Sequence, residues 1–318
     1  MHEKAREVRA GKGPDIRVIA GYGGKEKMRK IIFIVVAALA LTANTAVADM
    51  TYGLESRAPG GTVPSSAPTY LYSFEDNTPG SVTNVGRVRV NGSDVDADAL
   101  AWSTNYGLLA FTVQTGSATG SSMLEINPAT AVATPKGFSY SGRDIRGAVF
   151  DAGDNLWVAD AAQDQLLRIN PVNGNTEQII DLTLSGAAFN LSTATDIAIA
   201  RDGTFFLVST YDVYTVDVSI GALSPQHHFS GTSNALAGIA FSTDGPDNVL
   251  FGYEINYTDD IYQYDISSGY ARTDFALNFI SANAGRGDLA TITVPVPGAI
   301  LLGMIGLSVV GVKLRKRA

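Results

Sequence analysis

An internal repeat constrains the fold of this 318-residue chain more than any other feature. Short apolar segments recur at successive spacings of 48, 50, 41 and 50 residues. They are Ala99–Trp102, Gly147–Phe150, Ile197–Ala200, Gly238–Phe241 and Asp288–Thr291. After each of the first four comes a polar turn with a glycine and then a second apolar segment. A repeat of this length divides the hydrophobic core among similar units, each of which buries its apolar surface against a neighbour.

A third segment in each unit carries the clearest signature. Its four copies are Met123–Pro128, Leu166–Pro171, Val213–Val218 and Ile261–Ile266. Apolar residues alternate with variable ones, which predicts a half-buried strand. An Asn or Asp closes the pattern, and its side chain can bond the downstream backbone and start a turn into a fourth strand.

Four short strands in a unit of roughly 40 to 50 residues predict an all-β fold, a β-propeller of four-stranded blades. Four complete units cover residues 98–284, and a fifth begins at Gly287. Tyr70–Glu75 and Gly86–Val90 match its missing third and fourth strands. We therefore expect a composite blade that closes the ring and removes exposed sheet edges. Five blades are expected; six are the alternative, since residues 49–69 can add a strand.

Residues 28–48 have the parts of a secretory signal peptide. A basic start precedes the apolar stretch Ile31–Leu41, which is shorter than the ~20 residues of a membrane span. Small residues at Ala46 and Ala48 predict cleavage after Ala48; an uncleaved anchor is the alternative. Residues 1–27 precede a complete signal, and we interpret them as an upstream segment outside the natural protein.

The C-terminal residues 294–318 form a second terminal signal. A proline-containing motif opens it: Val294, Pro295, Val296, Pro297 and Gly298. An apolar stretch and the basic end Lys313–Ala318 follow, which predicts one transmembrane helix with its basic end inside. The segment resembles the PEP-CTERM class of bacterial sorting signals, as a variant without the acidic residue between the prolines. This resemblance implies processing by an exosortase-like membrane enzyme; a plain membrane anchor is the alternative.

The segments between these signals divide into a linker over residues 49–69 and the propeller over residues 70–293. The chain has 23 Lys and Arg and 31 Asp and Glu. Setting aside the 13 basic and 4 acidic residues of 1–48 and 295–318 leaves 10 basic and 27 acidic residues, a net charge of −17. Such an acidic domain argues against a nucleic-acid partner. The absence of cysteine excludes disulfides and thiolate zinc sites.

Charged residues stand at equivalent starts of the predicted inner strands. They are Asp98, Arg146, Asp196 and Asp288. The three aspartates of this set, together with Asp94 and Asp96, are the candidates for a Ca²⁺ site, which needs six to eight oxygen ligands. Read as an EF-hand loop, however, the segment from Asp94 fails, because its sixth and twelfth positions are Ala99 and Asn105. The alternative is a solvated acidic loop.

Aromatic residues and two histidines complete the candidates. Trp102 and Trp157 occupy repeated core positions, which predicts packing between blades. Five tyrosines gather in the last unit, and alternation predicts that some face outward, where they can stack on a sugar: Tyr253, Tyr257, Tyr262, Tyr264 and Tyr270. His227 and His228 are adjacent on one strand, so they are expected on opposite faces and cannot serve one site.

Two functions follow from these patterns. The first is an exported binding or structural module without a cofactor, in the cell envelope or extracellular matrix, anchored in the membrane or released. Its partners would be the exosortase-like enzyme and exopolysaccharide or envelope proteins. The alternative is a divalent-ion-dependent hydrolase, lactonase or lyase with its ion in the central channel.

Overall fold

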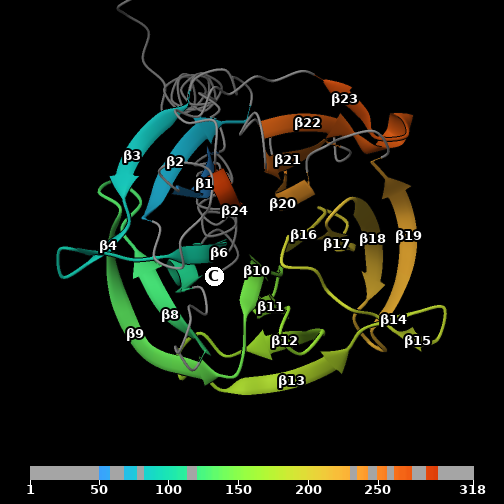
Figure 1. The fold of residues 1–318 in the computed structure, drawn as a ribbon, viewed down its shortest axis with the longest axis horizontal. Coiled ribbons are helices and arrows are strands. Elements are labelled where there is room, and N and C mark those ends of the chain that lie inside the picture. The colour runs from blue at the N-terminus through green and yellow to red at the C-terminus, as the bar shows by residue number, and fades with distance from the viewer. Residues whose placement is uncertain are drawn as a thin grey trace, which may run out of the picture. The chain divides into compact units, whose positions relative to one another are not determined.

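The computed structural model describes residues 50–57, 68–76, 82–112, 120–229, 235–242, 249–255, 261–273 and 284–292. Strands β1 to β24 and one 3₁₀-helix, η1 (Ile266–Ser268), make up the regular structure of these residues (Figure 1). The signal peptide with Ala46 and Ala48, the sorting motif Val294–Gly298 and the C-terminal tail lie outside the described residues. The described part contains no helix long and apolar enough to span a bilayer.

The strands form five sheets, each built on an antiparallel four-stranded meander. We name them by their order along the chain. The closing blade contains β24 (Ala284–Ile292), β1 (Met50–Arg57), β2 (Thr69–Glu75) and β3 (Thr83–Arg87). Blade 1 contains β6 (Ala97–Ser103), β7 (Gly107–Thr112), β8 (Gly120–Ile126) and β9 (Val132–Ser141). Blade 2 contains β10 (Ile145–Phe150), β11 (Leu156–Asp160), β12 (Gln165–Ile169) and β13 (Thr176–Asp181).

Blade 3 contains β16 (Thr195–Ile199), β17 (Phe205–Ser209), β18 (Asp212–Asp217) and β19 (Ala222–His228). Blade 4 contains β20 (Ala235–Phe241), β21 (Val249–Ile255), β22 (Ile261–Asp265) and β23 (Ala271–Thr273). Two short ribbons extend blades 1 and 3: β4 (Arg89–Val90) with β5 (Ser93–Asp94), and β14 (Thr183–Leu184) with β15 (Ala187–Ala188). Each ribbon pairs in parallel with the outer strand of its blade, β9 or β19.

The five inner strands follow one another around an axis in the order β6, β10, β16, β20 and β24, and β24 contacts β6 (Figure 1). Five hydrophobic clusters lie between the blades, one for each pair of neighbours. The cluster between blades 3 and 4, for example, joins Phe206 to Phe241 with ring centroids 5.0 Å apart. The prediction of a five-bladed, all-β propeller is confirmed, and the six-bladed alternative is wrong.

Both ends of the described chain contribute to the closing blade. Strand β1 pairs with β24 on one side and β2 on the other, with Gly53 opposite both Leu289 and Tyr72. The expected composite blade is therefore present, and β2 takes the predicted third position. The expected linker over 49–69 needs correction, because its residues 50–57 are the second strand of this blade. Buried side chains of β1 such as Leu54 pack in the hydrophobic cluster between the closing blade and blade 1.

The segment 86–90, predicted as the fourth strand of the same blade, is divided. Gly86 and Arg87 end β3, but Arg89 and Val90 belong to β4 and pair with β9 of blade 1. Between them, Val88 is fully buried in the cluster shared by the two blades. The chain crosses from the closing blade to blade 1 at Val88. The crossing is fixed there because the side chain of Val88 packs between the two blades.

The repeated turn chemistry is confirmed in blades 1 to 4. The side-chain Oδ1 of the closing Asn or Asp accepts the backbone N–H two residues later, at 2.9 Å in all four: Asn127, Asn170, Asp217 and Asp265. A left-handed residue follows each time, namely Ala131, Gly174, Gly221 or Gly269. Asn and Asp thus act as local turn initiators.

Blade packing leaves no space for a side chain at one glycine of β10. A Cβ on Gly147 would lie 2.6 Å from Asp196 Cα of the next inner strand. We expect Gly147→Ala to lower the free energy of unfolding by about 1–3 kcal/mol, because the two inner strands must separate. Urea denaturation measures the change.

Gly153→Ala is the matched control. Gly153 lies in an exposed turn, where a Cβ would meet only the side-chain atoms of Asn155 and Asp151, at 3.1 and 3.3 Å. A loss of stability for Gly147→Ala no larger than that of the control would contradict the tight junction between blades 2 and 3.

Candidate functional site at the propeller axis

One repeated position of the inner strands carries charged side chains to the axis. It holds Asp98, Arg146 and Asp196 in blades 1 to 3, Ala237 in blade 4 and Asp288 in the closing blade. Asp288 is thus equivalent to Asp196, one residue away from the alignment that the repeat predicts, because Gly238 packs on Asp288 as Gly147 packs on Asp196. The strand register shifts at Asp98, Arg146 and Ala237, which is the mark of a β-bulge. Bulges re-aim a side chain without ending the strand. All four charged residues are buried, at 4% exposure or less.

Arg146 joins blades 1 and 2. Its Nη1 donates to Asp98 Oδ2 at 2.6 Å, and its Nη2 donates to Asp144 Oδ2 at 2.7 Å. Burial by itself would lower the pKa of Arg146, but the two carboxylates outweigh it and the net pKa is raised. The guanidinium therefore stays charged and holds two acidic side chains near the axis.

Asp196 and Asp288 bond to backbone amides of other blades. Asp196 Oδ2 accepts the N–H of Ile239 in blade 4 at 2.6 Å, and Asp288 Oδ2 accepts the N–H of Leu100 in blade 1 at 2.5 Å. The Oδ1 atom of each carboxyl accepts the amide of the next residue, at 2.6 Å. Each carboxyl thus ties its own inner strand to a neighbouring one.

The two carboxyls also hydrogen-bond to each other. Burial raises the pKa of both well above the ordinary range of an aspartate. The charge of Asp196 raises the pKa of Asp288 further, whereas the mutual hydrogen bond lowers that of Asp196. Two carboxyls in contact cannot both ionise easily, so the pair shares a proton at pH values where a free aspartate has lost it.

The structure does not gather the predicted calcium ligands into one site. Asp94 lies in β5, on the outer surface, where Arg87 and Arg89 bind it. Asp98, Asp196 and Asp288 approach the axis, but N–H donors already occupy their oxygens. Among the residues that the structure describes, no three His, Cys, Asp or Glu side chains form a group able to hold a metal ion. The donor set does not fit Ca²⁺, which needs six to eight oxygens free to face it.

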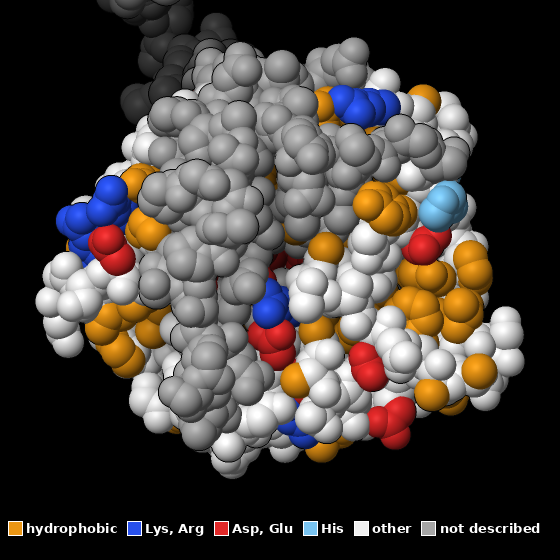
Figure 2. All heavy atoms as spheres, in the orientation of Figure 1, with side chains coloured by type: hydrophobic (Ala, Val, Ile, Leu, Met, Phe, Trp, Pro, Cys, Tyr) orange, Lys and Arg blue, Asp and Glu red, His pale blue; other side chains and the backbone are white. Residues whose placement is uncertain are grey.

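Sequence reasoning missed two acidic residues beside this cluster. Asp144 precedes β10 and binds Arg146, and Asp160 ends β11 fully buried. Asp160 Oδ1 accepts the N–H of Asp144 at 2.9 Å, while its Oδ2 accepts Arg143 Nη1 at 2.8 Å. A signal was present in the sequence, since an Asp directly after the apolar run Leu156–Ala159 interrupts a buried strand. Figure 2 shows basic and acidic side chains together near the centre of this face.

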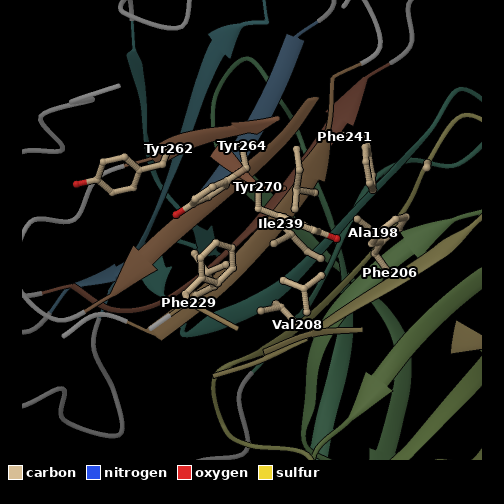
Figure 3. Close-up of a cluster of buried hydrophobic side chains, with 13 residues drawn as sticks. Ala198, Phe206, Val208, Phe229, Ile239, Phe241, Tyr262, Tyr264 and Tyr270 are labelled. Carbon is tan, nitrogen blue, oxygen red and sulfur yellow. The ribbon is translucent and has the colours of Figure 1, made fainter. Parts of the chain in front are cut away.

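The four described tyrosines of blade 4 do not form a sugar-binding platform. Tyr253, Tyr262, Tyr264 and Tyr270 are at most 7% exposed, and the last three pack in the cluster between blades 3 and 4 (Figure 3). The expectation of outward-facing rings was wrong for these four, because neighbouring blades cover both faces of each sheet. Tyr257 lies outside the described residues.

The other aromatic prediction is confirmed. Trp157 of blade 2 packs edge-on against Phe205 of blade 3, with ring centroids 5.4 Å apart. Trp102 packs against the cluster between blade 1 and the closing blade. The large rings of the repeat therefore fill the junctions between blades.

The two histidines point to different surroundings, as predicted. His227 stacks on Tyr270 with ring centroids 4.7 Å apart, whereas His228 Nδ1 lies 2.7 Å from Asp212 Oδ1 on the exposed side. Partial burial lowers the pKa of His227, and the neighbouring His228 adds to this effect. The structure does not bring the pair to the axis.

No protein-family profile and no curated protein sequence matches the chain. Among solved structures, glutaminyl cyclase from Myxococcus xanthus is similar, with 17% identity over 58% of this chain and 77% of that one, and a TM-score of 0.41. Virginiamycin B lyase from Staphylococcus aureus has 14% identity over 73% and 75%, with a TM-score of 0.38. A protein of unknown function from Bacteroides thetaiotaomicron has 13% identity over 77% and 65%, with a TM-score of 0.46. Similarity this distant carries no argument about activity.

Removing the axial guanidinium tests the charged cluster. Arg146→Met leaves Asp98 and Asp144 without their counter-charge, and we expect the free energy of unfolding to fall by about 3–5 kcal/mol. Urea denaturation at pH 7 measures the loss. Lys136→Met is the control, because the Lys136–Glu125 pair is exposed and should contribute at most about 1 kcal/mol. Equal small losses in both variants would contradict the interblade role of Arg146.

The shared proton predicts a pH dependence of stability. An unfolded aspartate has a pKa of about 3.9, so above that pH the folded pair holds more protons than the unfolded chain. The free energy of unfolding due to the pair therefore falls as pH rises from about 4 through the raised pKa. Asp288→Asn removes one titrating carboxyl and replaces one of its two acceptor oxygens by an NH2 donor, so the variant should be less stable than wild type at pH 5. This difference in the free energy of unfolding should shrink between pH 5 and 8.

The quantity to compare is the difference in unfolding free energy between variant and wild type. His227 is present in both proteins and raises this free energy as pH increases, so its contribution cancels in the difference. Because the pKa of His227 is lower in the folded protein than in the unfolded chain, the folded state becomes more stable as pH rises toward the pKa of the unfolded chain. Asp202→Asn is the control: its pKa is lowered by the amide of Thr204, so it titrates below this window. Parallel curves for wild type and Asp288→Asn would contradict the shared proton.

Proposed function

We propose that this protein is an exported binding module of the cell envelope or extracellular matrix, and that its axial charges serve architecture rather than catalysis. One observation carries the proposal. At the axis, Arg146 bridges two aspartates, and Asp196 and Asp288 accept backbone amides of neighbouring blades. An ion-dependent hydrolase, lactonase or lyase needs carboxylate oxygens that face the ion and the substrate.

The proposal includes delivery and sorting. A signal peptide ending at Ala48 would export the propeller, and an exosortase-like enzyme would process the segment from Val294. Sequence patterns at the two ends support this part. Mass spectrometry of the protein from its native cells tests it: the expected N-terminus is Asp49, and the expected product has lost the helix and basic tail. Peptides from residues 1–27 would contradict the assigned start, and an intact basic tail in all molecules would favour the plain anchor.

Binding can be measured on residues 49–294, because all five interblade clusters and both closing strands lie within them. We expect this domain to bind polysaccharides on a glycan array without added divalent ions. Calorimetry with Ca²⁺ should give no stoichiometric binding and no rise in the melting temperature. Stoichiometric Ca²⁺ binding that Asp196→Asn abolishes would instead support the ion-dependent enzyme.

A further inference from the structure

The outer surface where the closing blade meets the β4–β5 ribbon of blade 1 carries two arginines, Arg87 and Arg89, that bind the same carboxylate of Asp94; we call Arg87 and Arg89 the arginine pair. Arg87 Nη1 lies 3.1 Å from Asp94 Oδ2, and Arg89 Nε lies 2.8 Å from Asp94 Oδ1. Both guanidiniums stay accessible, with side-chain exposures of 43% and 47%. Two cations therefore share one carboxylate, and this cluster is net positive.

Backbone structure fixes the pair in place. Val88, between the two arginines, is fully buried, so alternation turns both neighbours toward solvent. Arg89 lies directly opposite Asp94 in the β4–β5 ribbon, whose turn is Asn91-Gly92 with φ values of 51° and 83°. An Asn-Gly turn of this kind sets the register of a two-residue hairpin. The backbone thus sets where both arginine side chains leave the surface, and Asp94 holds their guanidiniums there.

Tyr70 orients the first guanidinium. Arg87 Nε donates to Tyr70 Oη at 2.7 Å, and its Cζ lies 5.3 Å from the centre of the Tyr70 ring. Tyr72 stacks with the same ring, with centroids 6.5 Å apart. Tyr70 is therefore a positioning residue for Arg87 rather than a stacking surface for a sugar.

Two other surface cations are arranged differently. Lys136 pairs with Glu125, and Arg168 with Glu177, one acid to one base. The domain as a whole carries a net charge of −17. An acidic polymer is repelled by such a surface, so attraction is confined to places where cations outnumber acids. Figure 2 shows basic side chains gathered around an acidic one on the side where Figure 1 labels β3 and β4.

We infer that the arginine pair is a binding subsite for the carboxylate groups of an acidic, uronate-type polysaccharide. This inference rests on the proposed binding function and names its ligand class. Arginine suits the role because its planar guanidinium matches the geometry of a carboxylate. We expect each guanidinium of the pair to bind one carboxylate of the polysaccharide.

The experiment uses residues 49–294 and a short oligogalacturonate, with a neutral galactose oligomer of equal length as the comparison. At 25 mM salt, calorimetry should detect binding of the uronate and not of the neutral oligomer. Raising salt to 300 mM should weaken binding, because exposed charges are screened. Arg87→Gln/Arg89→Gln should lower the affinity about tenfold, as expected for two exposed ionic contacts.

Lys136→Gln/Arg168→Gln is the matched control, since it removes the same charge from one-to-one pairs. Its affinity should stay within about twofold of wild type. An equal loss in the control would overturn the subsite in favour of a diffuse charge effect. Arg89→Gln alone keeps the test open if the double variant does not fold. Binding of neutral glycans but not of the uronate would overturn this inference and leave the proposed function standing; no binding of any glycan would contradict both.

Discussion

The pairing of β1 with β24 is the contact on which the rest of the structure depends. Those strands come from opposite ends of the described chain and lie side by side from Met50 to Arg57 and from Ala284 to Ile292. Without that pairing, the closing blade would lack its inner strand and two interblade clusters would be exposed. Closure also leaves no unpaired strand edge between β1 and β24, and this pairing stabilises a chain that has no cysteine and therefore no disulfides.

A specific interaction near the axis holds each pair of neighbouring blades together. An ion pair joins blades 1 and 2, and carboxyl-to-amide bonds join blade 3 to blade 4 and the closing blade to blade 1. At the two remaining junctions a glycine, Gly147 or Gly238, lets the next inner strand approach to within about a van der Waals contact of its backbone. Charged side chains at the axis are therefore part of the packing between blades.

Much of this architecture could be predicted from the sequence. The repeat indicated the fold, the blade number and the composite closure, because each strand type recurs with its own signature. Strand β1 was expected only as part of the six-bladed alternative and otherwise as a linker, since Met50–Arg57 has neither a copy of the Asn/Asp turn nor a long apolar run. The prediction that some tyrosines face solvent was wrong for a related reason. Alternation predicts that one face of a strand is exposed to solvent, but in β11 and β17 every residue is buried between neighbouring blades.

The axial site was predicted in residues but not in role. Repeat position alone predicted four charged residues at the axis: Asp98, Arg146, Asp196 and Asp288. The bonds of Asp288 to Leu100 and of Asp196 to Ile239 depend on contacts between blades, which no local sequence pattern encodes. Hydrogen exchange of these two amides tests the account most directly. If the aspartates lock the ring, the amides of Leu100 and Ile239 exchange only through global unfolding, at the slowest rates in the domain. Exchange as fast as in the exposed turns would contradict it.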